Sequence, residues 1–212
     1  VPKENFINYT QGPTQGPPFA NPQVRAVYEG TDQKLWFGAV DGGLYCYDTA
    51  SRHYTHYPKK NDPFYEAISQ ASVTEIRQTG PHTLLVANWG TGIITLDLRQ
   101  GMFRPVEGLT QEPGIDNRVQ CFRQGPGGIL WIGTEGGLYS YDTATGNHQT
   151  YTTHSTPPLP DNRVQPNAMV FENDTTLWIG TWAGGLSRLT LSKNARTIRH
   201  IKTWRATPKG HN

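Results

Sequence analysis

The sequence predicts an all-β protein, a β-propeller built from four consecutive four-stranded blades. Three observations predict it: a motif that recurs at a near-constant spacing, short alternating segments around each copy, and a composition rich in turn formers. The chain has 212 residues, of which 23 are glycine, 16 are proline and 35% are hydrophobic. This profile is typical of many short strands joined by tight turns.

The recurring motif is a Leu-Trp strand that ends in a glycine-rich bend. It appears in full at residues 35–45, 130–139 and 177–186, and a degenerate copy lies at residues 84–93. The central positions of the four copies are Trp36, Leu85, Trp131 and Trp178. Successive copies lie roughly 46 to 49 residues apart, which is the length of a four-stranded propeller blade.

The third repeat predicts the four strands of a blade most clearly. They are residues 117–122 as the inner strand, then 129–134, 138–142 and the outer strand at 148–152. The second strand is almost entirely apolar, as expected where neighbouring sheets cover both of its faces. A glycine pair between the second and third strands permits the positive φ of a tight turn.

By this pattern the four blades cover approximately residues 21–58, 72–107, 116–152 and 161–204. The whole chain, residues 1–212, is expected to be one propeller array. Residues 6–10 repeat the outer-strand pattern, and we expect them to be the last strand of a preceding blade. The chain would then be part of a larger propeller, and the apolar faces of its end blades would bind a partner.

Each motif tryptophan is expected to pack between blades, because each occupies the same place in an apolar central strand. Cys46 and Cys121 fall at unrelated positions of two repeats, and we expect both to be buried small hydrophobic residues. The long loop at residues 59–71 is expected to fold a short helix over one rim of the propeller.

Charge and motif content argue against several classes of function. The net charge is +2 and the basic residues are scattered, so we expect no nucleic-acid partner. No apolar stretch approaches the ~18 residues of a membrane span. The seven histidines are dispersed, and calcium loops, nucleophile elbows and phosphate-binding loops are absent from the sequence. We therefore expect no metal, no cofactor and no catalytic residue.

The repeats resemble the two-component regulator propeller family. The matching segments are residues 119–122, 130–134, 136–139 and 141–142. The second blade departs most from the pattern, with Leu85 in place of tryptophan and Ala87 in place of glycine. The resemblance covers roughly residues 21–204.

This resemblance implies the periplasmic sensor region of a hybrid two-component histidine kinase of the inner membrane. In that family, propellers of about seven blades precede a small β-sandwich, a transmembrane helix and a cytoplasmic kinase or cyclase. Such hybrid kinases often detect oligosaccharides. The resemblance therefore favours a non-catalytic, extracytoplasmic module that senses an oligosaccharide or another small ligand. A second copy or a neighbouring propeller is a further expected partner.

Candidate ligand-binding residues lie where the loops between second and third strands share one rim with the starts of the inner strands. Exposed tryptophan offers a flat surface to sugar C–H groups, and nearby polar side chains bind hydroxyl groups. The candidates are Asp41, Asn88, Trp89, Arg118, Glu135, Arg163 and Trp182.

Alternatives to this site stay open. Trp89 and Trp182 could pack on an adjacent blade instead. The pairs Asp116-Asn117 and Asp161-Asn162 could be turn residues at the start of a strand. The chain could also be a structural or protein-interaction propeller that mediates dimerisation. A propeller lyase or hydrolase, with acid and base groups converging over the channel, is the least favoured alternative.

Overall fold

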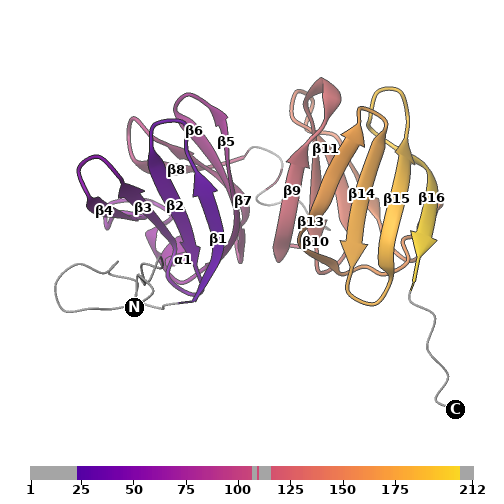
Figure 1. Ribbon diagram of the computed structural model, residues 1–212, viewed down its shortest axis with the longest axis horizontal. Coiled ribbons are helices and arrows are strands. Elements are labelled where there is room, and N and C mark those ends of the chain that lie inside the picture. The colour runs from indigo at the N-terminus through magenta and orange to yellow at the C-terminus, as the bar shows by residue number, and fades with distance from the viewer. Residues whose placement is uncertain (1–22, 107–108, 110–115, 206–212) are drawn as a thin grey trace, which may run out of the picture.

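The structure is a computed structural model, and it describes residues 23–106, 109 and 116–205. It contains four antiparallel sheets of four strands each, and in every sheet the strands pair in chain order. Figure 1 shows the outer strands β4 and β16 at the two sides of the molecule and β9 near its middle. The prediction of an all-β chain with four consecutive four-stranded blades is therefore confirmed.

The strands of the four blades have the following bounds. Blade 1 consists of β1 Val24–Glu29, β2 Lys34–Ala39, β3 Leu44–Asp48 and β4 His53–Tyr57. Blade 2 consists of β5 Ser72–Gly80, β6 Thr83–Trp89, β7 Gly92–Asp97 and β8 Met102–Pro105. Blade 3 consists of β9 Val119–Gln124, β10 Ile129–Thr134, β11 Leu138–Asp142 and β12 His148–Tyr151. Blade 4 consists of β13 Val164–Asn173, β14 Thr176–Thr181, β15 Gly185–Leu191 and β16 Ile198–Trp204.

Two segments between strands are also ordered into short elements. The loop after blade 1 contains the helix α1 Tyr65–Ser69, as expected, and a 3-10 turn at Pro126–Gly128 joins β9 to β10. The loop with α1 lies against the β2–β3 turn, where the backbone N–H of Gly43 donates to the Ala71 carbonyl at 3.4 Å. Residues 6–10, for which we expected an outer strand, lie outside the described residues.

Apolar side chains fill three layers, one between each pair of neighbouring blades. Trp36 and Trp131 lie in these layers with only 2% and 0% of their surface exposed, so the predicted packing between blades is confirmed for both. The indole N–H of Trp131 also donates to the carbonyl of Ala195 in blade 4, at 3.1 Å. Trp178 has the equivalent position in blade 4 and is half-buried, because no further sheet of the described residues covers it.

Neighbouring blades approach so closely that the motif glycine leaves no room for a side chain. A Cβ atom on Gly38 would lie 2.5 Å from Cγ1 of Val73, and a Cβ atom on Gly133 would lie 2.5 Å from Cγ1 of Val164. Each valine stands on the inner strand of the next blade. The glycine of the Leu-Trp-Ile-Gly motif therefore sets the distance between two sheets.

One buried ion pair also crosses between blades. Glu75 of β5 has a side chain that is 3% exposed, and it forms ion pairs with Arg123 of β9 and with Arg77. Its second oxygen accepts a hydrogen bond from the backbone N–H of Phe122 at 2.8 Å. Because charge is costly to bury without partners, the contacts of Glu75 with Arg123 and Phe122 fix β9 against β5.

We expect Gly133→Ala to lower the free energy of unfolding by about 1–3 kcal/mol, because the added methyl group must displace Val164 from a packed layer. Gly180→Ala is the matched control, since the same motif position in blade 4 meets only Cβ of Ala168, at 3.0 Å. Denaturant unfolding followed by tryptophan fluorescence measures both variants. Equal losses would show that the contact between blades is not what requires glycine.

Candidate functional site

The candidate site lies on one edge of the propeller, which we call the rim. The turns between the second and third strands of the blades meet the starts of the inner strands there. The β14–β15 turn, at the lower edge of the molecule in Figure 1, is one of these turns. The rim is defined by Asp41, Asn88, Trp89, Asp116, Arg118, Gln120, Glu135, Asp161, Arg163 and Trp182.

Backbone hydrogen bonds hold three of the rim turns in the same way. In blades 1, 3 and 4 the first residue of the turn donates its N–H to the carbonyl of the residue before the inner strand. The pairs are Val40 to Gln23 (2.9 Å), Glu135 to Arg118 (3.3 Å) and Trp182 to Arg163 (2.9 Å). In blade 2 the turn instead reaches blade 3, where Trp89 forms an isolated antiparallel bridge with Arg118.

Glu135 is the common acceptor of the rim. Its Oε2 accepts from Nη1 of Arg118 at 2.9 Å, and its Oε1 accepts from Nε2 of Gln120 at 3.1 Å. Nη2 of Arg163 lies 2.8 Å from the same Oε1. Arg118 and Gln120 belong to blade 3 whereas Arg163 belongs to blade 4, so this half-buried carboxylate connects two blades.

Asp116 fixes the other side of Arg118. Its two oxygens accept from Nε and Nη2 of Arg118 at 3.0 and 2.7 Å, and Oδ1 also accepts from the Arg118 backbone N–H at 2.8 Å. Burial opposes ionisation of Asp116, but the hydrogen bonds and the charge of Arg118 outweigh it and lower the pKa of the carboxyl group. The hydrogen bonds and charge of Asp116 in turn raise the pKa of Arg118. Both groups are therefore charged at neutral pH.

The same Asp116 turn explains a small difference from the expected strand. The inner strand of blade 3 begins at Val119, two residues later than expected, because Asp116 and the two residues after it form the turn. In blade 4 Asp161 has the same place: its Oδ1 accepts from the Arg163 backbone N–H at 3.3 Å, and its Oδ2 accepts from Ala183 N–H at 2.7 Å. Both aspartates are thus turn residues, which was one of the open alternatives.

The two rim tryptophans differ in how much surface they present. Trp182 is 67% exposed, with the guanidinium carbon of Arg163 4.8 Å from its ring centroid. Trp89 is half-buried, and the guanidinium of Arg25 covers its ring at 4.4 Å. Packing on an adjacent blade therefore does not describe Trp182, whose ring stands free at the rim beside a fixed cation.

Two of the expected site residues stand apart from this cluster. Asp41 is exposed on blade 1 with a φ of 49°, and it accepts from the hydroxyl of Ser72 at 3.1 Å. Asn88 is fully buried, and its Oδ1 accepts from the backbone and hydroxyl of Thr91 at 3.0 and 2.8 Å. Asn88 therefore shapes the β6–β7 turn, and neither residue is a partner of Glu135.

Sequence reasoning missed Gln120 and Arg25. Gln120 stands two positions after Arg118, so regular strand alternation would place the two side chains on one side, but a β-bulge at Gln120 interrupts that alternation. No signal within one repeat pointed to Arg25, because its contact with Trp89 depends on how blade 1 packs against blade 2.

Other kinds of site are not found in the described residues. In residues 23–106, 109 and 116–205, no three His, Cys, Asp or Glu side chains group around a metal position. No helix within those ranges combines the length and the apolar character needed to cross a bilayer.

Both cysteines are buried as expected, and desolvation raises the pKa of the Cys46 and Cys121 thiols to about 12. The thiols are therefore protonated and unreactive at neutral pH.

One segment of the chain matches the model of a known protein family. Residues 113–136, which contain the Asp116 turn, β9, β10 and Glu135, match the family model described as two component regulator propeller. This segment is therefore similar to a two component regulator propeller repeat. No curated protein matches the chain. The other blades of this propeller repeat the architecture of the matched one, as their strand order shows.

Solved structures of similar fold come from Bacteroides thetaiotaomicron. One is the extracellular domain of a hybrid two component system, with 22% identity and a TM-score of 0.65 over 85% of this chain. A second such extracellular domain has 20% identity and a TM-score of 0.65 over 95% of the chain. An auxiliary nutrient binding protein has 10% identity and a TM-score of 0.60 over 86%. The chain spans 25%, 24% and 42% of these proteins, and it shares their propeller fold.

The lowered pKa of Asp116 predicts a pH effect on stability. The ionised Asp116 carboxylate stabilises the folded state in full above the pKa of an unfolded aspartate, about 3.9. This stabilisation is lost as the pH falls through the lower pKa that Asp116 has in the folded state. Because Arg118 is 56% exposed, we expect Asp116→Asn to lower stability by only about 0.5–1 kcal/mol at pH 7 and to flatten the loss of stability in acid.

Urea unfolding between about pH 2 and pH 7 measures this effect. Asp174→Asn, which changes an exposed carboxylate in the β13–β14 turn, is the control. If the pH profile of Asp116→Asn matches that of the unmodified chain, Arg118 does not stabilise the folded state through Asp116.

Proposed function

We propose that the chain is a non-catalytic, extracytoplasmic ligand-sensing module of a two-component signalling receptor, and that its rim binds a neutral oligosaccharide. The observation that carries this proposal is the position of Trp182. Its ring is 67% exposed at the rim, and Arg163 beside it is held by Glu135. An exposed aromatic ring next to oriented polar groups is the arrangement that binds a sugar.

The charges of the rim favour a neutral ligand. Arg118 is paired with Asp116 and Glu135, and Arg163 is paired with Glu135. A phosphate, sulfate or carboxylate ligand would compete with these carboxylates for the guanidinium groups and would be repelled by their negative charge. Hydroxyl groups carry no charge, so they form hydrogen bonds at the rim without displacing a carboxylate.

The relatives support a location outside the cytoplasm and a small ligand. Two of the similar structures are extracellular domains of hybrid two component systems, and a third is an auxiliary nutrient binding protein. We therefore propose that the chain lies in the periplasm, as part of the ectodomain of an inner-membrane histidine kinase.

The rim geometry also offers a route from binding to signalling. Glu135 connects Arg118 of blade 3 with Arg163 of blade 4, so a ligand that repositions Arg163 changes the contact between two blades. A sensor needs such differential contacts to shift its population of states. The lowered pKa of Asp116 supports the absence of catalysis, because general acid–base chemistry favours a group that titrates near the working pH.

Trp182→Ala is expected to weaken binding of neutral oligosaccharides at least tenfold, because it removes the exposed ring on which the sugar stacks. Trp204→Ala is the matched control, since Trp204 is 42% exposed but stands on the outermost strand β16. Isothermal titration calorimetry with oligosaccharides of several sugar types measures both. The rim is not the binding site if the two variants retain equal affinity.

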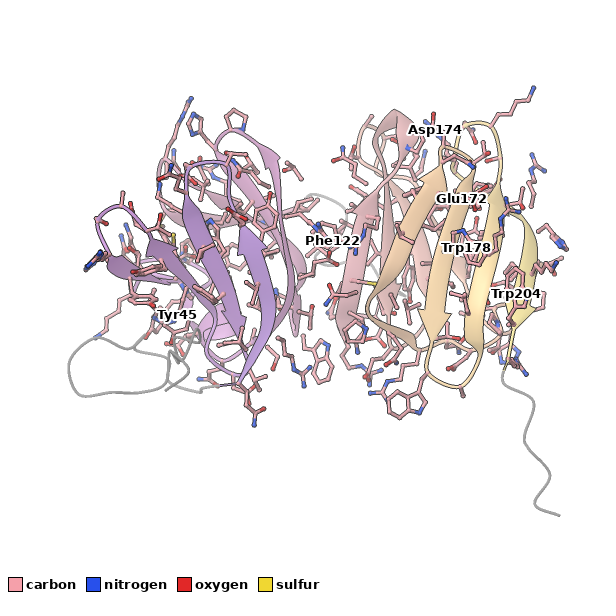
Figure 2. All side chains as sticks on the ribbon, viewed as in Figure 1. Tyr45, Phe122, Glu172, Asp174, Trp178 and Trp204 are labelled. Atoms are coloured by element: carbon pink, nitrogen blue, oxygen red, sulfur yellow. The ribbon has the colours of Figure 1, made fainter. Side chains whose placement is uncertain are left out.

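A second candidate function, protein interaction, is favoured by the outer face of blade 4. This face, turned away from blade 3, carries Val170, Trp178, Leu186 and Trp204. Val170, Leu186 and Trp204 are 59%, 48% and 42% exposed, and Trp178 stacks on Trp204 with ring centroids 5.4 Å apart. Figure 2 labels both tryptophans on this face. The equivalent face of blade 3 is covered by blade 4, so the outer face of blade 4 is suited to packing against another sheet.

If this face binds a second copy of the chain, Val170→Glu should convert a dimer to a monomer, because it places a charge in the apolar contact. Thr150→Glu, at an exposed position of β12, is the control. Light scattering coupled to size-exclusion chromatography gives the mass of each variant. A chain that is monomeric at every concentration would speak against self-association through this face.

A further inference from the structure

Four buried polar atoms of the rim have no hydrogen-bond partner. They are Asn88 Nδ2, Trp89 Nε1, Gln120 Oε1 and Arg163 Nε. Among the described residues, the one other such atom belongs to Asp142. Native structures leave few buried polar atoms unpaired, because each one lowers stability. Their concentration at the rim indicates that their partner comes from outside the chain.

Two of these atoms belong to side chains that bind Glu135, and a third belongs to Trp89 of the neighbouring blade. Gln120 and Arg163 bind the same carboxylate oxygen, at 3.1 and 2.8 Å, so the unpaired Gln120 Oε1 and Arg163 Nε flank one group. Trp89 is adjacent through its backbone bridge with Arg118, two residues before Gln120. Asn88 points to the opposite side of β6 from Trp89, because successive side chains of a strand alternate, and we leave it out of this group.

Exposed side chains cover Arg163 and Trp89. The ring of Trp182 lies over the guanidinium of Arg163, and the guanidinium of Arg25 lies over the ring of Trp89. Trp182 and Arg25 are both exposed, so either side chain can take another rotamer without displacing a packed neighbour. A ligand that stacks on Trp182 and displaces Arg25 reaches the layer beneath.

The chemistry of the three atoms selects a hydroxyl group. Trp89 Nε1 and Arg163 Nε are donors, whereas Gln120 Oε1 is an acceptor. An ionised carboxylate or phosphate only accepts and leaves Gln120 unpaired, and an ammonium group only donates and leaves the other two unpaired. A hydroxyl group both donates and accepts, so adjacent hydroxyls of one sugar satisfy all three.

We propose that Trp89 Nε1, Gln120 Oε1 and Arg163 Nε form the floor of the rim site and bind sugar hydroxyl groups beneath Trp182. This inference rests on the proposed function and adds to it the residues that decide specificity. Trp89 and Gln120 are then ligand-binding residues, and Arg163 has two roles, since it also orients the Trp182 ring.

Trp89→Phe tests the floor, because it keeps a ring under Arg25 and removes only the unpaired N–H and part of the indole. We expect about five- to tenfold weaker binding with an unchanged or slightly higher melting temperature. Trp131→Phe is the matched control. Its N–H already has a partner in Ala195, so it should lower the melting temperature and leave the affinity unchanged.

The probes are cellohexaose, xylohexaose, mannohexaose and arabinohexaose, titrated by calorimetry into the unmodified chain and each variant. Gln120→Met, which removes the acceptor, gives a second measure that does not depend on how well Trp89→Phe folds, and it should also weaken binding. If Trp89→Phe and Gln120→Met bind the sugars as tightly as the unmodified chain while Trp182→Ala binds them more weakly, the proposed floor residues are wrong but the proposed site at the rim is retained. If the unmodified chain binds none of the four sugars, the proposed function fails, and the floor with it.

Discussion

The close contact between the second strand of one blade and the inner strand of the next is the constraint on which the structure depends. At Gly38 and Gly133 the facing valine leaves no space for even a methyl group. The sheets therefore pack at a fixed and short distance, and the inner strands β5, β9 and β13 lie close to one another around the axis. Side chains at the ends of these strands meet across blades for this reason alone.

The rim cluster is a direct result of that convergence. Arg163 begins the inner strand of blade 4, yet its partner is the turn residue Glu135 of blade 3. A carboxylate that accepts from two arginines and an amide has little capacity left for a cation, and the charges of both arginines are already paired with carboxylates. The cluster of Asp116, Arg118, Glu135 and Arg163 is consequently polar and carries no net charge, and Trp182 is the most exposed aromatic group of the rim.

The fold was predictable from the sequence because its two determinants are local and repeated. A motif at blade-length spacing and an apolar central strand are visible in every copy, even where Leu85 replaces tryptophan. The rim positions of Arg118, Glu135, Arg163 and Trp182 followed from the same alignment.

What the alignment could not supply is the geometry between blades. The shared acceptor role of Glu135 depends on the angle between two sheets, and no pattern within a repeat encodes that angle. Gln120 lies beside a β-bulge that shifts the register between β9 and β10, so its reach to Glu135 could not be read from strand alternation alone. Asp41 and Asn88 matched by position, but Asp41 accepts a hydrogen bond from Ser72 of blade 2 and Asn88 accepts from Thr91 of its own turn.

The backbone hydrogen bonds that hold the rim turns have an evolutionary consequence. In blades 1, 3 and 4 the first turn residue is fastened through its main chain, and at this position the chain carries valine, glutamate and tryptophan in otherwise equivalent turns. Its side chain can therefore change in chemistry without disturbing the scaffold. A propeller of this kind can acquire a new ligand by exchanging a few such side chains, while the packed layers between its blades stay as they are.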